Sequence, residues 1–247
     1  MSNDLNGKVA LVTGGSRGIG AAVAIQLARQ GADVALTYQR SADAAANVVD
    51  EIKAVGNRAL AIQADSAEAG ELTGAVEQVV GEFGRLDILV NNAGVGVLGP
   101  LQEIALPDVD HAIAVNVRAP FVAAQAAAPH MADGGRIISI GSCVGERTPF
   151  PGMTLYALSK TGLAGMTKGL AKELGPRGIT ANLVHPGPTD TDMNPAHGQM
   201  AAAQQAETAL GSYGHPEDVA AMVAHLAGPG GRYVTGANIA VDGGWAA

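Results

Sequence analysis

The sequence predicts an α/β protein with a single Rossmann-like domain, in which a doubly wound parallel sheet of about seven strands is flanked by helices. Short apolar runs alternate with alanine-rich helical stretches along residues 1–247, an order typical of parallel sheets covered by helices. The runs are apolar at nearly every position, as expected for strands buried on both faces. No linker or repeat interrupts the alternation, so we expect one domain.

The strands are expected at the β-branched and aliphatic runs. These runs are Val9–Val12, Asp33–Thr37, Ala59–Ile62, Leu86–Val90, Arg136–Ile140, Ile179–Val184 and Asn238–Val241. Between the second and third runs, Val48, Ile52 and Val55 have the spacing of one helix face, and Gly56 marks the end of that helix. Pro107 and Pro216 lie where first helical turns are expected, because that turn tolerates a residue without an N–H.

One segment breaks this alternation. Pro186, Pro188 and Pro195 precede a weak helical pattern at residues 199–209. Long irregular connections in compact domains are usually functional loops. We therefore expect a lid over the substrate at about residues 188–212.

Composition excludes several classes of protein. A net charge of −8 without any lysine or arginine run argues against nucleic-acid binding. No apolar stretch is long enough to span a bilayer and residues 1–8 do not resemble a signal peptide, so we expect a cytoplasmic protein without membrane contact. Cys143 is the only cysteine and the six histidines lack metal-ligand spacing, so we expect neither a disulfide nor a metal site.

A glycine-rich turn follows the first predicted strand. Residues 13–20 read Thr-Gly-Gly-Ser-Arg-Gly-Ile-Gly and run directly into a helix. Glycines let the backbone approach a pyrophosphate, and the start of a helix offers N–H groups and a positive dipole end. The spacing is Gly-x-x-x-Gly-x-Gly, and a turn of this kind taken alone is also compatible with no ligand.

Polar and glycine clusters follow four further predicted strands at their carboxyl ends. They are Asp65, Asn91–Gly94, Ser142 and Pro186-Gly187. The carboxyl ends of parallel strands share one edge of the sheet, where ligands bind. Turn chemistry alone would scatter such clusters over both edges, so the pattern predicts a single site.

Tyr156 and Lys160 are four residues apart in a helical segment, which puts them on one face. A tyrosine has a pKa of about 10, and an adjacent ammonium favours its phenolate. The pair is a candidate general acid and base. A solvated helix face is the commoner reading of such a pair, but its combination with Ser142 and the glycine-rich turn is much more specific.

Together these motifs resemble the short-chain dehydrogenase/reductase family over essentially the whole chain, with the closest general likeness to 3-oxoacyl-(acyl-carrier-protein) reductases and related ketoreductases. The matching elements are Thr13–Gly20, Asp65, Asn91–Gly94, Asn116, Ser142, Tyr156, Lys160, Pro186-Gly187 and Val241–Gly244. The resemblance implies an NADP-dependent oxidoreductase. Such an enzyme reduces a ketone or aldehyde, or reversibly oxidises a secondary alcohol, by hydride transfer.

The resemblance also implies four catalytic residues. Tyr156 donates a proton to the substrate oxygen, and Lys160 binds ribose hydroxyls and lowers the tyrosine pKa. Ser142 orients the carbonyl, and Asn116 holds a water that links Lys160 to solvent. Asparagine has a low helix propensity, so Asn116 within Val115–Val117 also predicts a helix kink.

The cofactor contacts follow from the same resemblance. Asp65 is expected at the adenine, Asn92 and Gly94 along the cofactor channel, and Thr189 and Thr191 at the carboxamide. The full expected set is Gly14, Ser16, Arg17, Gly18, Ile19, Gly20, Arg40, Ser41, Asp65, Ser66, Asn92, Ala93, Gly94, Tyr156, Lys160, Pro186, Gly187, Thr189 and Thr191.

The choice of cofactor depends on charge after the second strand. NAD-selective folds place an acid there for the ribose 2′-hydroxyl, but this chain has no acid until Asp43. Arg17 and Arg40 are placed to pair with a 2′-phosphate instead. We therefore expect NADPH rather than NADH, unless both arginines are only solvated surface charges.

Two departures from the family pattern bear on the substrate. Ser142 and Tyr156 are 14 positions apart, one more than is usual in the family, so Glu146–Gly152 is expected to bulge near the substrate. The segment before the fifth strand is basic in carrier-protein reductases but reads Ala132-Asp133-Gly134-Gly135 here. Docking of an acidic carrier protein is therefore doubtful, although Arg177 remains.

Two functions stay open at this point. The first is an NADPH-dependent reductase of a small or medium carbonyl compound. The second is a regulatory protein that binds cyclic di-GMP, because residues 145–153 and 186–195 resemble those of a biofilm-dispersal member of the family. An intact Ser142, Tyr156 and Lys160 favours the enzyme, since a pure binder or a purely structural homologue does not need all three.

The resemblance further implies a homotetramer with a C-terminal subunit contact. Residues 115–128 are rich in alanine, and small residues allow close helix approach. The chain ends on Trp245-Ala246-Ala247, which is apolar where a solvated terminus is usually polar. Packing of both regions inside the monomer is the alternative.

Overall fold

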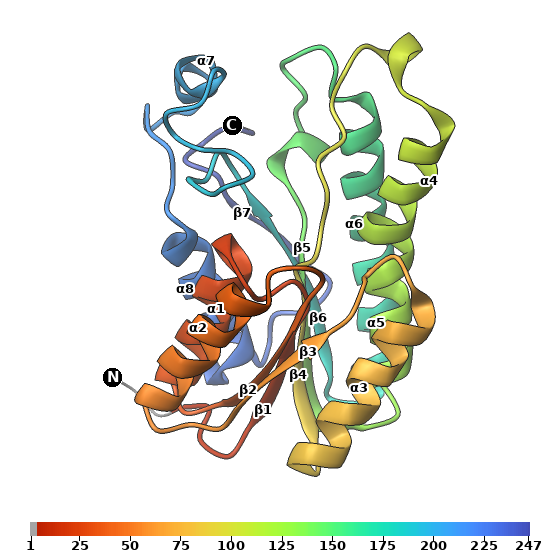
Figure 1. The fold of residues 1–247 in the computed structure, drawn as a ribbon, viewed down its shortest axis with the longest axis vertical. Helices are drawn as coiled ribbons and strands as arrows, with labels where there is room; N and C mark the ends of the chain where they lie inside the picture. Colours follow the sequence, from red (N-terminus) through yellow and green to blue (C-terminus); the bar gives the residue numbers. More distant parts are fainter. Residues whose placement is uncertain (1–3) are drawn as a thin grey trace.

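The structure, a computed structural model, describes residues 4–247 and contains one seven-stranded parallel sheet (Figure 1). The strand order is β3-β2-β1-β4-β5-β6-β7, and every neighbouring pair is parallel. The strands are β1 (Val9–Val12), β2 (Asp33–Tyr38), β3 (Ala59–Gln63), β4 (Leu86–Asn91), β5 (Met131–Ile140), β6 (Thr180–Pro186) and β7 (Asn238–Val241). The predicted fold class is confirmed.

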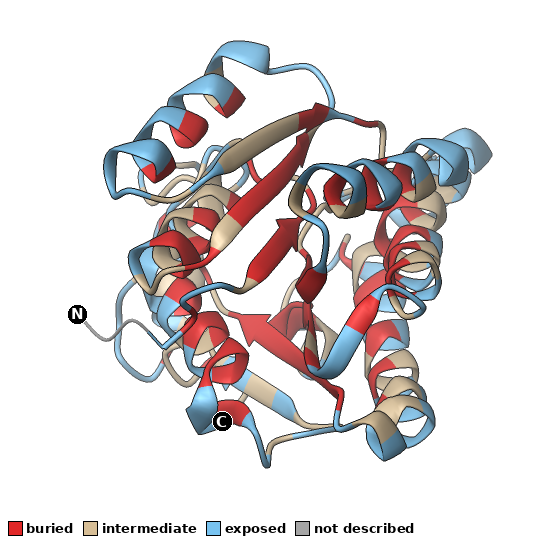
Figure 2. Cartoon of the chain, turned by 90° about the horizontal axis from the view of Figure 1, so that it is seen from below, coloured by how far each residue is buried: buried red, intermediate tan, exposed pale blue. Residues whose placement is uncertain are grey.

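Helices cover both faces of this sheet. One layer contains α1 (Gly18–Arg29), α2 (Ala42–Ala54) and α8 (Pro216–Ala227), and the other contains α3 (Ala69–Phe83), α5 (Ala119–Ala127) and α6 (Thr154–Leu174). Each layer packs its apolar side chains against one face of the strands, as the buried inner sides of the helices in Figure 2 show. Because both faces are covered, the strands are apolar throughout rather than alternating.

The strand order reverses between β1 and β4, which are neighbours although β2 and β3 lie between them in the sequence. The chain leaves β1 toward β2 on one side of this point and crosses to β4 on the other. In open α/β sheets such a reversal leaves a crevice at the carboxyl ends of the strands, where ligands bind. The glycine-rich turn after β1 and Asn91–Gly94 after β4 meet there.

The predicted strands lie within two residues of the observed ends, except at the start of β5. This strand begins at Met131, five residues before the apolar run at Arg136. Its pairing with β4 is irregular between Leu86 and Ile88, and Gly134 has a left-handed φ of 79°. The irregular stretch exposes Ala132–Gly134, so their composition did not predict a strand.

The helix around Asn116 is also irregular, as expected from the sequence. Between α4 (Leu106–Ile113) and α5 the chain forms a π-helical turn, Ala114–Arg118, which buries Asn116. The proline positions are confirmed too, because Pro107 and Pro216 lie in the first turns of α4 and α8. Among the helices within residues 4–247, none is long and apolar enough to cross a membrane.

The C-terminus does not offer the apolar surface that its sequence suggested. The Trp245 side chain is only 2% exposed and packs with Cys143, Val144 and Met153 of the same chain. Many of the alanines of residues 115–128 are likewise buried within the monomer: Ala119, Ala123, Ala124 and Ala127. These buried side chains pack inside the monomer, the alternative that the sequence left open for them, and the homotetramer itself stays a prediction.

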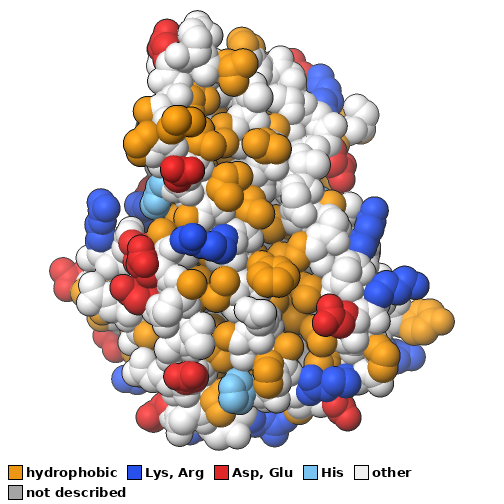
Figure 3. Space-filling model, turned by 90° about the vertical axis from the view of Figure 1, so that its right-hand side faces the viewer, with side chains coloured by type: hydrophobic (Ala, Val, Ile, Leu, Met, Phe, Trp, Pro, Cys, Tyr) orange, Lys and Arg blue, Asp and Glu red, His pale blue; other side chains and the backbone are white. Residues whose placement is uncertain are grey.

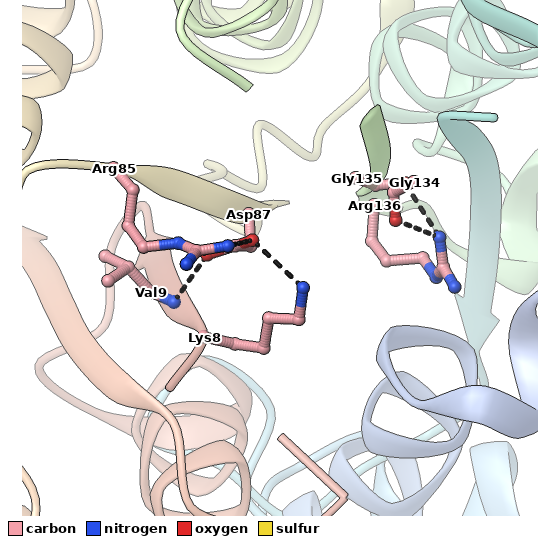
Figure 4. Close-up of polar contacts among 7 residues, drawn as sticks. All are labelled: Lys8, Val9, Arg85, Asp87, Gly134, Gly135 and Arg136. Atoms are coloured by element: carbon pink, nitrogen blue, oxygen red, sulfur yellow. Dashed lines mark hydrogen bonds and ion pairs between the residues drawn. The ribbon is translucent and has the colours of Figure 1, made fainter. Parts of the chain in front are cut away.

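A charged cluster joins β1 to β4 at the amino ends of the strands (Figure 4). The buried carboxylate of Asp87 accepts hydrogen bonds from the Arg85 guanidinium at 2.6 Å, the Lys8 ammonium at 3.2 Å and the Val9 backbone N–H at 3.0 Å. Burial raises the pKa of Asp87, but the hydrogen bonds from Arg85 and Val9 and the nearby Lys8 outweigh it and hold this pKa below its usual value.

Candidate active site

The turn between β1 and α1 is built for close backbone approach. Gly14 and Gly18 have left-handed φ angles of 63° and 53°, which favour glycine. A Cβ at Gly20 would lie 2.3 Å from the Gly14 carbonyl oxygen and 2.4 Å from Asn92 Nδ2. The glycines at positions 14, 18 and 20 are therefore required by the turn itself.

The amino end of α1 has the properties of an anion-binding site. Arg17 precedes the helix without a side-chain cap, and the first turn, which includes Ile19, contains no acidic residue. The N–H groups of a helix start then lack intrahelical partners and face the crevice with a positive dipole. A cradle of glycines at an uncapped helix start fits the pyrophosphate of a dinucleotide.

The end of β4 holds this turn in place. Thr13 Oγ1 accepts the backbone N–H groups of Asn92 at 3.0 Å and of Ala93 at 3.1 Å. The Asn92 side chain in return donates to the carbonyl oxygens of Thr13 and Gly14, both at 2.9 Å. The structure therefore gives Asn92 a clear role in supporting the turn, beyond the cofactor contact expected from the sequence.

The residues expected at the adenosine end lie at the carboxyl ends of β2 and β3. Arg40 and Ser41 are exposed just before α2. The Asp65 carboxylate accepts hydrogen bonds from Gln39 Nε2 at 2.6 Å and from the Ala67 N–H at 2.8 Å. Ser66 lines a narrow recess together with residues of β1, β4 and α5: Thr13, Asn91, Ala93, Ala119 and Pro120.

Ser142, Tyr156 and Lys160 lie close together at the same edge of the sheet. The Ser142 hydroxyl accepts the Val144 N–H at 3.2 Å, and it lies close enough to the Tyr156 phenol to lower the pKa of that phenol. Lys160 is buried one turn further along α6 and donates to the Ile140 carbonyl oxygen at 3.1 Å. Its ammonium nitrogen lies 6.0 Å from the centre of the Tyr156 ring.

Asn116 joins this group through its side-chain amide. Asn116 Nδ2 donates to the Val95 carbonyl oxygen at 2.9 Å and to Ser159 Oγ at 3.0 Å, and its Oδ1 accepts the Val95 N–H at 2.9 Å. A Cβ at Gly94 would lie 3.1 Å from Lys160 Nζ and 3.3 Å from Asn116 Oδ1. A glycine at position 94 therefore leaves room for the lysine and the asparagine to approach each other.

Burial dominates the electrostatics of this cluster. It raises the pKa of Tyr156 above its usual value, although the Ser142 hydrogen bond lowers it. It lowers the pKa of Lys160 to about 8, because the ammonium is surrounded by protein. Because burial has the larger effect, the pKa of Tyr156 stays above its usual value and the phenol is protonated at neutral pH.

The segment after β6 returns to the glycine-rich turn. A Cβ at Gly187 would lie 2.6 Å from the Asp242 backbone, so this position needs glycine for packing against the end of β7. Thr189 is buried and donates to the Gly187 carbonyl oxygen at 3.0 Å. Thr191 lies next to Gly18.

Asp192 approaches the same turn from the segment 188–212. Its carboxylate oxygen Oδ2 lies 3.6 Å from Arg17 Nη1, and both side chains are exposed. The segment 188–212 contains one short helix, α7 (Ala201–Ala206), beyond the carboxyl edge of the sheet at the top of Figure 1. The structure thus joins the start of this segment to the glycine-rich turn.

Sequence reasoning missed a second connection of this segment. Arg147, in the irregular stretch after Ser142, donates to the Trp245 carbonyl oxygen at 3.0 Å and pairs with Glu207 just after α7. The Trp245 indole N–H donates back to the Arg147 carbonyl oxygen at 3.2 Å. The only sequence signals were an arginine in the extra-long stretch and a single terminal tryptophan, and neither identifies its partner.

Cys143 is a buried packing residue rather than a reactive thiol. Burial and the charge of Asp242 raise the pKa of this thiol to about 12, so the thiolate is not accessible near neutral pH. Within residues 4–247, no group of three His, Cys, Asp or Glu side chains is arranged to hold a metal ion.

Comparison with known proteins identifies the family that has this fold and this site. The family model described as enoyl-(acyl carrier protein) reductase matches residues 14–246. The chain belongs to the short-chain dehydrogenase/reductase family, as its motifs indicated. Among curated relatives, the cyclic-di-GMP-binding biofilm dispersal mediator protein of Escherichia coli is 47% identical over 241 residues, which cover 98% of each chain.

Solved structures are closer still. A blue fluorescent protein from a metagenomic library, solved in complex with NADPH, is 58% identical with a TM-score of 0.97, covering 99% of this chain and 100% of that one. A short-chain dehydrogenase from Burkholderia cenocepacia in complex with NADP is 57% identical with a TM-score of 0.98 and the same coverage. Close structural neighbours were thus crystallised with NADPH or NADP.

Proposed function

We propose that the protein is an NADPH-dependent carbonyl reductase that converts a ketone or aldehyde reversibly to an alcohol. The observation that carries this proposal is that Ser142, Tyr156 and buried Lys160 lie together, with Lys160 Nζ 6.0 Å from the centre of the Tyr156 ring, at the sheet edge that also contains the glycine-rich turn. A regulatory protein that only binds a dinucleotide does not require this trio. When bound, NADPH supplies the hydride that the carbonyl carbon accepts.

The chain itself supplies the proton and the orientation. Tyr156 donates its phenolic proton to the carbonyl oxygen as that oxygen gains negative charge, and its raised pKa keeps the proton in place beforehand. Ser142 donates a hydrogen bond that orients the same oxygen. Lys160 holds the ribose hydroxyls, and its positive charge favours the phenolate left after proton transfer. Asn116 supports Lys160 from the π-helical turn.

Each part of the cofactor is assigned to its own group of residues. The turn and the start of α1 hold the pyrophosphate, Arg17 and Arg40 hold the 2′-phosphate, and Thr189 and Thr191 hold the carboxamide. Residues 188–212 act as a lid whose two ends are joined to the turn and to Arg147. A cytoplasmic location, a homotetrameric assembly and doubtful docking of a carrier protein complete the proposal. Arg177, which remained a possible docking residue, pairs with Asp133 and donates to two backbone carbonyl groups.

A panel of ketones and aldehydes tests this function. The oxidation of NADPH is followed by absorbance, and cofactor binding is followed separately by the fluorescence of bound NADPH. Tyr156→Phe is expected to lower kcat by at least about a hundredfold, because it removes the general acid, while NADPH binding stays within about twofold. Tyr233→Phe, at a side chain that is 97% exposed, is the matched control. More than a few per cent residual activity in Tyr156→Phe contradicts the mechanism.

A second candidate function is a cyclic di-GMP-binding regulator. The single observation in its favour is the 47% identity to the Escherichia coli relative of that name. Titrating the protein with cyclic di-GMP, alongside the panel of carbonyl substrates, distinguishes the regulator from the reductase. Tight cyclic di-GMP binding that displaces NADPH, with no turnover on any carbonyl, favours the regulator. Turnover that cyclic di-GMP does not inhibit favours the reductase.

A further inference from the structure

The structure places a buried histidine directly beneath Ser142. His185 is the penultimate residue of β6 and is 2% exposed. Its ring nitrogen Nδ1 lies 2.8 Å from the Ser142 carbonyl oxygen and 3.3 Å from the Ser142 backbone nitrogen.

We propose that His185 is a positioning residue for Ser142, whose carbonyl oxygen accepts a hydrogen bond from the His185 Nδ1–H. This inference rests on the proposed function, because it assumes that the place of the Ser142 hydroxyl matters for turnover. The Ser142 backbone is extended, with φ −166° and ψ 145°, and its hydroxyl accepts the Val144 N–H at 3.2 Å. Holding the carbonyl group of Ser142 therefore fixes the backbone from which the hydroxyl projects.

The shorter of the two contacts between His185 Nδ1 and Ser142 indicates which tautomer the imidazole adopts. A carbonyl oxygen only accepts hydrogen bonds, so the 2.8 Å contact is favourable only when Nδ1 carries a proton. The other contact is longer and would need a lone pair on the same nitrogen. In the tautomer with Nδ1–H, the second nitrogen Nε2 is buried and has no hydrogen-bond partner among the described residues, with Glu146 Oε1 at 3.8 Å.

Glycine at position 141 makes room for this arrangement. A Cβ there would lie 2.8 Å from His185 Nδ1 and 3.0 Å from its Cε1. Gly141 does not have a left-handed φ, so its backbone alone would accept alanine. The absence of a side chain at position 141 thus leaves room for the imidazole ring, which links β6 to Ser142, the second residue after β5.

A pair of isosteric substitutions separates the two ring nitrogens. The side-chain amide of asparagine takes about the place of Nδ1, and that of glutamine takes about the place of Nε2. We expect His185→Gln to lower kcat about tenfold, the upper range for one hydrogen bond, and His185→Asn to retain most of it. Gly141→Ala is expected to reproduce the loss by displacing the ring, and the double variant Gly141→Ala/His185→Gln to add little to it.

Two further measurements separate positioning from damage to the fold. NADPH binding and the thermal midpoint are expected to stay near those of the unmodified protein in all variants. Equal losses of kcat in His185→Asn and His185→Gln, or no loss in His185→Gln, overturn the proposal.

The nitrogen-15 NMR spectrum of the unmodified protein tests the tautomer without any turnover. Protonation at Nδ1 supports the proposal, and a neutral ring protonated only at Nε2 overturns it. If no carbonyl compound is reduced, the proposed function fails, whereas the spectrum still decides whether His185 holds Ser142.

Discussion

We expect two exposed arginines, Arg17 and Arg40, to set the preference between NADPH and NADH. Arg17 lies at the glycine-rich turn, where its nearest anionic partner is Asp192 of the lid at 3.6 Å. Both side chains are exposed, and exposed ion pairs of this kind contribute little. A phosphate with two negative charges is therefore able to replace Asp192. Arg40 is exposed at the end of β2, before any acid is reached in the sequence.

Removing these two arginines is expected to narrow the preference for NADPH over NADH. A hydrogen bond to a charged group contributes about 1.5–3 kcal/mol, so Arg17→Ala with Arg40→Ala should reduce the ratio of kcat/KM values roughly ten- to a hundredfold. Arg29→Ala, at the opposite end of α1, is the matched control and should leave the ratio unchanged. Equal efficiency with both cofactors in the unmodified protein would sink this prediction.

At the residue level, the sequence predicted which side chains share a helix face, but it did not predict how deeply those side chains are buried. The four-residue separation of Tyr156 and Lys160 was enough to put them on one side of α6, because helix geometry is regular. The direction of the tyrosine pKa was not predictable, since it depends on burial by residues distant in sequence. His185 is a second example, because its contact with Ser142 exists only when β5 and β6 pair.

At the level of elements, Arg147 joins three segments that we expect to surround the substrate. Its guanidinium bridges Glu207 after α7 and the Trp245 carbonyl oxygen at the C-terminus. The Phe150 ring packs edge-on against the Trp245 ring, with their centres 5.9 Å apart. Arg147 and Trp245 therefore hold together the irregular stretch 146–152, the end of the segment 188–212 and the C-terminus.

Breaking this link is expected to affect substrate binding more than chemistry. Arg147→Gln and Glu207→Gln should each raise the KM for the carbonyl substrate about three- to tenfold, because the walls of the substrate site become mobile, with a smaller change in kcat. The charge swap Arg147→Glu/Glu207→Arg should recover part of the loss. Hydrogen exchange provides the independent check, since amides of residues 208–211 should exchange faster in Arg147→Gln. Unchanged KM and unchanged exchange in both single variants would show that the link does not matter.

The charged cluster at the opposite edge bears on stability rather than catalysis. Asp87→Asn is expected to lower the free energy of unfolding by about 1–3 kcal/mol at pH 7, because a buried acceptor loses its charge-assisted bonds. The folded pKa lies below the value of about 3.9 for an unfolded aspartate. The unfolded state therefore binds more protons between these two values, and the stabilisation is lost as the pH falls through the folded pKa.

Urea unfolding at pH 7 and at pH 3 measures this dependence. The difference between the unmodified protein and Asp87→Asn should be large at pH 7 and smaller at pH 3. Asp33→Asn is the matched control, because Asp33 pairs with an arginine that is 57% exposed, and it should cost less. An equal cost for the two substitutions, or a difference independent of pH, contradicts this account.

Elements were predictable where local pattern and tertiary surroundings agree. The seven strands lay where apolar runs met helical stretches, because burial on both faces leaves a strong local signal. The C-terminus was not predictable in the same way. An apolar end is compatible with a subunit contact or with burial in its own chain, and only the position of Trp245 beside Cys143 and Val144 decided between them.

On the scale of the whole molecule, two surfaces remain available for self-association. Figure 3 shows the face that carries α4, α5 and α6, where hydrophobic side chains gather between charged groups that lie mostly toward the edges. Large apolar side chains exposed on these helices are Leu106, Phe121 and Leu158. The second surface is the open edge strand β7 with the neighbouring Tyr233, which is 97% exposed. Exposed apolar patches and open strand edges are typical sites of association.

We predict that these two surfaces build a homotetramer, as the family resemblance implies. Light scattering coupled to size exclusion should give a mass near four times the 24.7 kDa of one chain. Phe121→Glu should leave a dimer joined through β7, and Tyr233→Glu a dimer joined through the helices, because each charge would be buried without a partner. Val55→Glu, at a half-exposed valine that ends α2, is the matched control and should remain tetrameric. A particle near the monomer mass at micromolar concentration refutes the assembly. A dimer of the unmodified protein would leave one surface in use, and the substitution that dissociates it would identify which.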